Sequence, residues 1–191
     1  MNPPPVSTHE RIVAAAAELT TESGWAAITM SKLADRVGVS RQTVYNELGS
    51  KAQLAEEMVL RELTLFLGEV EEAFDASPDD LVEAIRAACR GVLELAQDNR
   101  LLKAVVSATH GADTELLPLL TTHSESLLGT AKAVVRARVA TYAVPLPDAR
   151  LDAAIDLIVR VVLSHVMQPS ASPQATADDI AWLSAQVLQP G

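Results

Sequence analysis

The side chains with the clearest potential for chemistry lie together in the stretch SRQTVYNELGSK, from Ser40 to Lys51. They offer a guanidinium, an ammonium, two carboxamides and several hydroxyls, with one carboxylate, that of Glu47. Proteins use such donors and acceptors on the base edges and phosphates of DNA. If the stretch is helical, Val44 faces inward and the exposed face carries Arg41, Gln42, Thr43, Tyr45 and Asn46. We therefore expect this face to bind DNA.

Elsewhere, residue types that could catalyse a reaction lack the spacing that catalysis needs. The four histidines show no metal-ligand spacing, and the single cysteine, Cys89, has no second thiol for a zinc site. Aspartates recur every fourth residue from Asp148 to Asp156, but Arg160 continues the row and can pair with Asp156, which favours a solvated face over a metal site. There is no nucleophile elbow, phosphate loop or dinucleotide fingerprint. We expect neither an enzyme nor a bound metal or cofactor.

Two short helices must position the polar stretch. Thr29 can cap the first and Ser40 the second, with Gly38 in a turn that requires positive φ. Ala34 supplies a small side chain where the helices cross, and Val44 faces back toward it. This pattern is typical of a helix-turn-helix, whose second helix enters the major groove. Similar helix pairs also occur in all-α domains that do not bind DNA, and the donor-rich face is what favours the DNA-binding alternative.

Composition and charge indicate a soluble chain with two modules. Of the 191 residues 49% are hydrophobic but only 3% aromatic, so the core is built from aliphatic side chains and favours helices. Residues 1–51 hold five basic and five acidic side chains, whereas the remainder holds ten basic and twenty acidic ones. The predicted domains are residues 1–50 and 51–191.

The sequence also bears on where the protein is found. The N-terminus lacks the features of a signal peptide, no apolar run is long enough to span a membrane, and one cysteine allows no intrachain disulfide. We expect a cytoplasmic protein without a membrane partner.

Helical spacing of apolar residues predicts an all-α fold of about nine helices without strands. Ser7 and Glu10 form a capping box for the first helix, and Gly24 ends it. Ser50 caps a long helix, and Ser77 with the following proline opens the next. The expected helices are 8–23, 29–37, 40–48, 50–74, 77–97, a short one in 99–110, 121–142, 148–167 and 176–189, with a turn or short helix near residue 118.

Residues 8–54 resemble the DNA-binding domain of the TetR (tetracycline-repressor-like) family. The matching features are GW after the first helix, IT, the helix LADRVGVS, a recognition helix with Thr-hydrophobic-Tyr, and SK at the start of the fourth helix. They occur in the family's order and spacing over about a quarter of the chain. The stretches SRQTVYNELGSK and LPLLTTHSESLL also resemble a subgroup of actinobacterial TetR regulators found beside alkane-hydroxylase genes.

The resemblance implies roles for the residues that match. Thr29 and Tyr45 would bind phosphates through their hydroxyls, and Lys51 would pair with another phosphate near the positive end of its helix. Arg41 and Gln42 would read bases. The full expected DNA-binding set is Thr29, Ser40, Arg41, Gln42, Thr43, Tyr45, Asn46 and Lys51.

Two positions depart from the family pattern. The family often has histidine where Asn46 stands and usually has phenylalanine where Leu48 stands. Asn46 can still donate a hydrogen bond, and Leu48 can still pack. Glu47 either points away from the phosphates or accepts from a cytosine amine.

In the family, the helices after the fourth form a ligand pocket and a dimer surface. The middle helices here are rich in apolar side chains, which predicts an apolar effector such as a long-chain lipid or a drug-like molecule. His110 and His123 could add polar contacts, although a histidine at a helix end or on the surface is the more common case. The candidate pocket residues are Phe66, Phe74, Val105, Val106, His110, Leu127, Leu128 and Tyr142.

A dimer is expected because one small helix-turn-helix makes few contacts, whereas two related by a twofold axis read half-sites about 34–36 Å apart. Helix 148–167 is apolar over more than one face, and the last helix has one apolar stripe with Trp182 beside it. The alternative is that both helices only complete the core of one chain. The candidate dimer residues are Ile155, Ile158, Val159, Val162, Val166, Ile180, Leu183 and Val187.

These observations predict a transcriptional regulator. We expect a homodimeric repressor that binds an inverted-repeat operator and leaves it when a hydrophobic small molecule binds. This effector could be related to fatty acids or alkanes. The alternative is an all-helical carrier of small molecules that has lost DNA binding. Recognition of an operator beside the chain's own gene would distinguish them.

Overall fold

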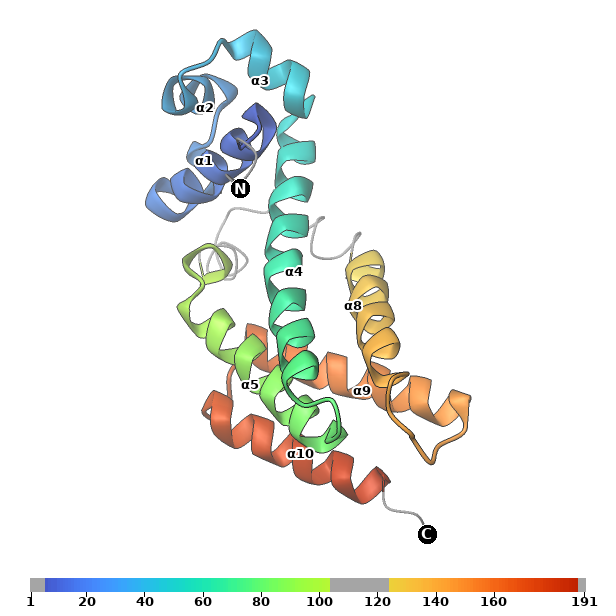
Figure 1. Ribbon diagram of the computed structural model, residues 1–191. Coiled ribbons are helices and arrows are strands. Elements are labelled where there is room, and N and C mark those ends of the chain that lie inside the picture. The colour runs from blue at the N-terminus through green and yellow to red at the C-terminus, as the bar shows by residue number, and fades with distance from the viewer. Residues whose placement is uncertain (1–5, 104–123, 189–191) are drawn as a thin grey trace. The chain divides into compact units, whose positions relative to one another are not determined.

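The computed structural model describes residues 6–103 and 124–188, and these residues form helices connected by short turns, with no strand among them (Figure 1). The predicted all-α class is confirmed for this part of the chain. In chain order the elements are α1 (Thr8–Ser23), η1 (Trp25–Ala27, a 3-10 turn), α2 (Met30–Val37), α3 (Arg41–Leu48), α4 (Lys51–Ala76), α5 (Leu81–Asp98), α8 (Ser124–Val139), α9 (Asp148–Met167) and α10 (Pro173–Leu188). No helix of the described residues is long and apolar enough to cross a membrane.

Contacts divide the chain into two compact units, and α4 belongs to both. Among the described residues, the first unit contains 6–62 and 99–103 together with Ser124, and the second contains 63–98 and 125–188. The boundary lies inside α4, and not at its start, because Leu54, Ala55 and Met58 of α4 are buried in the core of the first unit.

The first unit is held by α1, α2, α3 and the first turns of α4 packed around one aliphatic core (Figure 1). Ile12 of α1, Leu33 of α2 and Val44 of α3 are completely buried there. The capping box at the start of α1 is present, since Ser7 and Glu10 each accept from the other's backbone N–H. The predicted bounds of α1 and its stop at Gly24 are confirmed.

The second unit packs α5 against α10 and α9, and α8 against α9. Small side chains allow α5 and α10 to approach closely: Ala84 and Ala88 are buried on α5, as are Ala177 and Ala181 on α10. Basic residues of α8 face acidic ones of α9. Arg136 contacts Asp148 and Asp152, at 2.6 and 3.1 Å, and the ammonium of Lys132 lies 2.9 Å from Asp156.

Two predicted helix starts were wrong, for one physical reason. At α5 the cap is Asp80, whose carboxylate accepts from the backbone N–H of Glu83, and the helix begins after a turn that starts at Ser77. At α10 the cap is Ser172, which accepts from the N–H of Ala175, so that Thr176 is buried inside the helix. Both segments contain several residues able to cap a helix, and tertiary packing selects among them.

The helix expected at 121–142 is described from Ser124 and ends at Val139. The helix expected at 148–167 is confirmed at both ends. The stretch around Pro118 and most of the short helix in 99–110 lie outside the described residues, apart from residues 100–103, which are helical.

Candidate nucleic-acid interface

The turn between α2 and α3 depends on Gly38. It has φ +75° and ψ +37°, the left-handed conformation that glycine adopts without a side-chain clash. Its N–H and that of Val39 both donate to the carbonyl of Ala34, at 2.9 and 3.0 Å, which closes the C-terminus of α2. Ala34 is buried, and Val44 packs in the same core. The predicted helix-turn-helix is therefore present.

The starts of the two helices are capped as expected. Thr29 accepts from the N–H of Lys32 at 3.2 Å, and Ser40 accepts from the N–H of Thr43 at 3.0 Å. The hydroxyls of Ser40 and Thr43 lie 2.8 Å apart and bond to each other. Because a capping hydroxyl uses an oxygen lone pair, the proton of Thr29 remains available to a phosphate oxygen.

The side chains of α3 that face solvent pair with one another one helical turn apart. Gln42 Nε2 donates to Asn46 Oδ1 at 2.9 Å. Arg41 Nη2 donates to Tyr45 Oη at 3.3 Å, and its guanidinium lies 5.5 Å from the centre of the Tyr45 ring, a cation–π contact. All four side chains are exposed, and Val44 and Leu48 are buried on the opposite face. The structure thus brings the expected base-reading residues onto one surface.

Lys51 lies in the first turn of α4, which Ser50 caps by accepting from the N–H of Gln53 at 3.2 Å. Its ammonium is 4.9 Å from the centre of the Trp25 ring. The GW pair after α1 therefore has a physical role, because Gly24 turns the chain and Trp25 supplies both core packing and an aromatic face for Lys51.

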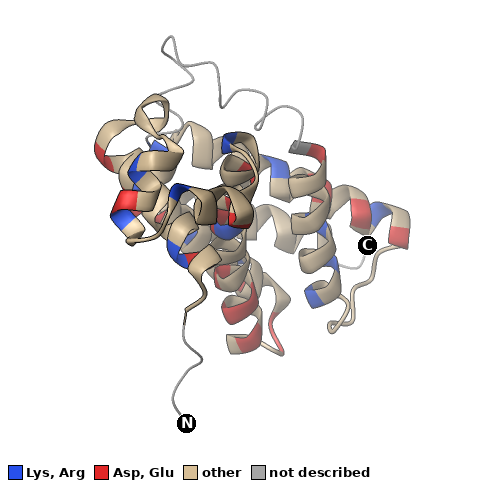
Figure 2. Cartoon of the chain, turned by 90° about the horizontal axis from the view of Figure 1, so that it is seen from above, with Lys and Arg blue, Asp and Glu red and all other residues tan. Residues whose placement is uncertain are grey.

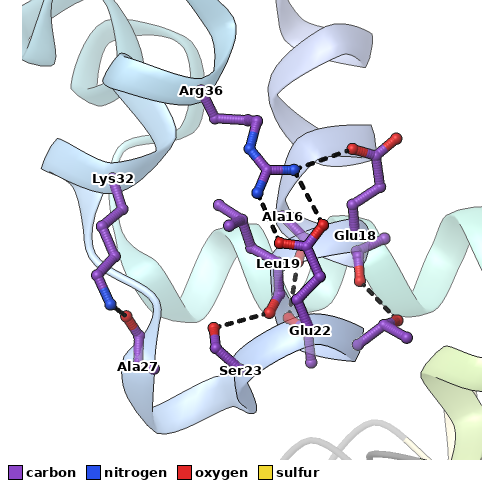
Figure 3. Close-up of polar contacts among 11 residues, drawn as sticks. Ala16, Glu18, Leu19, Glu22, Ser23, Ala27, Lys32 and Arg36 are labelled. Atoms are coloured by element: carbon purple, nitrogen blue, oxygen red, sulfur yellow. Dashed lines mark hydrogen bonds and ion pairs between the residues drawn. The ribbon is translucent and has the colours of Figure 1, made fainter.

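Arg36 is held by acidic residues of α1, and Figure 3 shows its guanidinium between them. Glu22 contacts it at 2.6 Å and Glu18 at 3.4 Å. The hydrogen bond from Arg36 lowers the pKa of Glu22, and the same contact raises the pKa of Arg36. This arginine is therefore neutralised within the domain and joins α2 to α1.

A second arginine, Arg11, donates from Nη2 to the carbonyl of Val37 at 2.7 Å and so caps the C-terminus of α2. Lys32, which the sequence analysis did not single out, is exposed in the first turn of α2 with its Nζ 2.8 Å from the carbonyl of Ala27 (Figure 3). Its place three residues after the Thr29 cap was the signal that could have found it.

Glu47 faces α1. The Nδ1–H of His9 donates to the Glu47 carbonyl at 3.3 Å, the Glu47 carboxylate lies 4.0 Å from the same nitrogen, and Glu57 of α4 is 3.6 Å from His9 Nε2. Of the two expectations for Glu47, this geometry fits the one in which its carboxylate points away from the phosphates. Along the helices, Lys and Arg are interspersed with Asp and Glu (Figure 2).

Two of the expected pocket residues belong to the structure at the end of α4. The Phe74 and Tyr142 rings meet edge to face with centroids 5.9 Å apart. The hydroxyl of Tyr142 donates to the carbonyls of Ser77 and Phe74, at 2.8 and 3.3 Å, and burial, with three nearby aspartates, raises the pKa of this phenol. Phe74 is 5% exposed. Within the chain these contacts give both residues a packing role, Phe74 inside the core and Tyr142 beside it, and their part in a ligand pocket stays a prediction.

The remaining expected pocket residues divide into two groups. Phe66, Leu127 and Leu128 are half-buried on α4 and α8. Val105, Val106 and His110, together with His123, lie outside the described residues.

The expected dimer residues divide in the same way. Ile155 and Ile180 are each 5% exposed and pack in cores of the second unit, so their place at a dimer surface stays a prediction. Ile158, Val159, Val162 and Val166 are half-buried, whereas Leu183 and Val187 are exposed. Five further apolar residues of these helices are exposed although they were not among the candidate dimer residues, since burial within the chain cannot be read from apolar spacing alone: Leu157, Val161, Leu163, Met167 and Trp182.

The described residues contain no group of three acidic, histidine or cysteine side chains placed to hold a metal ion. Burial raises the pKa of Cys89 to about 12, which keeps this thiol protonated and unsuited to nucleophilic attack. The hydrogen bond from Lys132, and after it the expected one from Arg160, lower the pKa of Asp156. This fits the solvated face predicted for the aspartate row.

A capped helix-turn-helix joined to a separate helical unit defines a class of DNA-binding regulators, and comparison with known families agrees. Residues 12–58 match the model of bacterial regulatory proteins of the TetR family, and residues 80–186 match that of a bacterial tetracyclin repressor C-terminal domain. The chain belongs to the TetR family of transcriptional regulators, as its sequence predicted.

Among its relatives are AlkX proteins, which bears out the expected subgroup. The chain is 29% identical over 174 residues to the HTH-type transcriptional regulator AlkX of Mycobacterium tuberculosis, covering 91% of this chain and 82% of that one. The crystal structure of the TetR family repressor AlkX from a Dietzia strain, implicated in biodegradation of n-alkanes, superposes with a TM-score of 0.74 at 27% identity over 96% of both chains. The transcriptional regulator FadR of Bacillus subtilis, solved in complex with stearoyl-CoA, shares the fold, with a TM-score of 0.62 at 18% identity over 95% of this chain and 100% of that one.

Proposed function

We propose that this regulator is a homodimeric repressor that binds an inverted-repeat operator through α3 of each subunit and leaves it when a hydrophobic small molecule binds. The observation that carries the proposal is the division of α3 into two faces. Val44 and Leu48 anchor the helix in the core, while Arg41 and Gln42 extend into solvent from its first turn. A helix anchored in this way can present its N-terminal side chains to the major groove.

The proposed dimer surface consists of the exposed apolar residues of α9 and α10. Leu157 and Trp182 are each 64% exposed and Leu183 is 56% exposed, which is unusual for such side chains in an isolated subunit. Replacing Leu183 by glutamate should shift the mass measured by light scattering from dimer toward monomer, because burying an unpaired carboxylate is costly. Leu183→Met serves as the control and should remain dimeric.

The proposed effector is a long-chain aliphatic molecule. The half-buried Phe66, Leu127 and Leu128 fit an apolar chain better than a polar ligand. Similar proteins have related ligands or pathways: the Dietzia AlkX repressor is implicated in biodegradation of n-alkanes, and the Bacillus subtilis FadR structure holds stearoyl-CoA.

The proposed coupling between effector and operator uses α4, since this one helix contributes to both compact units. A ligand that binds one conformation of the second unit more tightly than another would increase the population of that conformation. If α4 is displaced between the two conformations, Lys51 in its first turn moves with it. The effect on operator affinity can then be no larger than the difference in ligand binding free energy between the two states.

A competition binding experiment tests the proposal. Fluorescently labelled DNA from upstream of the chain's own gene is challenged with unlabelled copies of itself or with a shuffled sequence of equal length and composition. We expect clear preference for the native sequence, and release on addition of stearoyl-CoA or of a long n-alkane in detergent. Equal competition by the shuffled DNA would refute the repressor, and ligand binding without any DNA preference would instead favour the carrier.

A further inference from the structure

The exposed surface of α3 contains a carboxamide pair with a defined direction. Gln42 donates from Nε2 to Oδ1 of Asn46, one turn later, at 2.9 Å. Both side chains are exposed, and neither is a member of the core that anchors α3. Since Gln42 is in the first turn of α3 and Asn46 is one turn further along, Gln42 is closer to the end of the helix that would enter the groove.

This direction determines which hydrogen-bonding groups Gln42 has left for a base. A glutamine carboxamide has two N–H donors and one carbonyl acceptor. When the N–H directed away from Oε1 is donated to Asn46, the other N–H and Oε1 remain side by side. An adjacent donor and acceptor match the N7 acceptor and the N6 amino donor on the major-groove edge of adenine. Guanine presents two acceptors at the same edge and would leave Oε1 without a donor.

Resting on the repressor function proposed above, we propose that Asn46 is the positioning residue for Gln42, and that together they select an A·T pair at one position of each half-site. Asn46 acts by holding the carboxamide of Gln42 in one orientation. Without it the group is able to turn over, which exchanges donor and acceptor and removes the distinction between adenine and other bases.

Neighbouring contacts separate this role from a structural one. α3 is anchored by Val44, Leu48 and the Ser40 cap, whereas the hydrogen bond of the carboxamide pair joins two exposed side chains. Side-chain pairs one turn apart on an exposed helix contribute little to its stability. Replacing Asn46 by alanine should therefore leave the fold intact and change only how Gln42 is presented.

The test measures base preference at every position of the operator. Binding of the native upstream DNA is compared with that of variants carrying each of the four base pairs at each half-site position, for the wild type, Gln42→Ala, Asn46→Ala and the double variant. At one position the wild type should prefer A·T by roughly tenfold or more per half-site. Each single variant should lose that preference at that position, and the double variant should lose no more than Gln42→Ala alone.

A conservative variant provides the rescue. Asn46→Asp retains an oxygen that accepts from Gln42 Nε2, so the preference for A·T should survive, while the added negative charge weakens binding of every sequence alike. Arg41→Ala, in the same turn as Gln42, is the matched control and should change preference at a different position. Circular dichroism confirms that each variant is folded.

The outcomes are distinct. Loss of preference at a different position in Asn46→Ala would show that Asn46 reads its own base, and uniform weakening would show a phosphate contact; either result overturns the positioning role. Preference by the wild type for G·C at the Gln42-dependent position would overturn the assignment to adenine. A wild type with no preference at any position would refute the proposed repressor function itself, and this inference with it.

Discussion

The salt dependence of operator binding distinguishes the cations that reach phosphates from those that stabilise the domain. Lys51→Ala and Arg36→Ala each remove one positive charge from residues 1–51, called the reading head below because they contain the helix-turn-helix. Lys51 is at the start of α4 beside the Trp25 ring, whereas Arg36 is held by Glu22 and a second carboxylate of α1. We expect only the lysine substitution to change the number of phosphates neutralised.

The expected magnitude follows from counting side chains. Residues 1–51 contain five basic residues, of which Arg36 is paired with carboxylates of α1 and Arg11 caps the C-terminus of α2, so these two are left out of the count. The other three, Lys32, Arg41 and Lys51, give at most about six phosphate contacts in a dimer, and hence a slope of log K against log salt near −5. Between about 50 and 200 mM salt, affinity should fall about a thousandfold, but only about a hundredfold for Lys51→Ala, whose slope is smaller by about 1.8.

The measurement is fluorescence anisotropy with labelled upstream DNA over this range of salt at constant pH, with thermal melts to confirm that both variants are folded. Arg36→Ala should retain the wild-type slope even if its stability is lower. If Arg36→Ala reduces the slope as much as Lys51→Ala does, or if the wild-type slope is much steeper than about −6, then the ion pair with Glu22 opens on DNA and our count is wrong.

Three further predictions concern stability. Tyr142→Phe should lower the free energy of unfolding by about 1–2 kcal/mol in urea, because the carbonyl of Ser77 loses its donor while the ring contact remains; an unchanged value would mean that water replaces the hydroxyl. Gly38→Ala should cost about 1 kcal/mol in thermal unfolding, since a Cβ there meets nothing within 4 Å and only the left-handed backbone is unfavourable; a much larger loss would reveal a clash. Asp156 has a lowered pKa, caused first by Lys132, so it stabilises the fold above its unfolded pKa and this contribution is lost as pH falls through the lowered value. Acidification from about pH 5 to about pH 2 should thus destabilise the wild type more than Lys132→Met, and equal losses would contradict this linkage.

The local features of the reading head could be predicted because neighbouring residues determine them. The Ser7 capping box, the Thr29 and Ser40 caps and the turn at Gly38 each depend on residues within one helical turn. The inward position of Val44 followed from helical spacing and is confirmed by its complete burial. The face of α3 that carries the polar side chains was consequently known from sequence alone.

Contacts between distant residues could not be predicted in this way. Arg36 and Glu22 are fourteen residues apart, and His9 and Glu47 are thirty-eight residues apart, so their contacts exist only after α1 packs against the helix-turn-helix. The same limit applies to the prediction for Ile180. Its apolar spacing fits a dimer surface or a core, and in the structure it packs in the core beside α5. Spacing shows which residues share a face, and packing decides what that face meets.

The pairing of charges also explains how residues 1–51, which hold as many acidic as basic side chains, can approach DNA. Glu22 is bound to Arg36, and Glu10 is used in the cap of α1, which lowers the pKa of both carboxyls. Glu47, the one acid of the reading stretch, is turned toward His9. Because these acids are occupied within the domain, the field near the phosphates depends on where the individual cations lie and not on the net charge of residues 1–51. Removing Glu47 should therefore strengthen DNA binding far less than removing Lys51 weakens it.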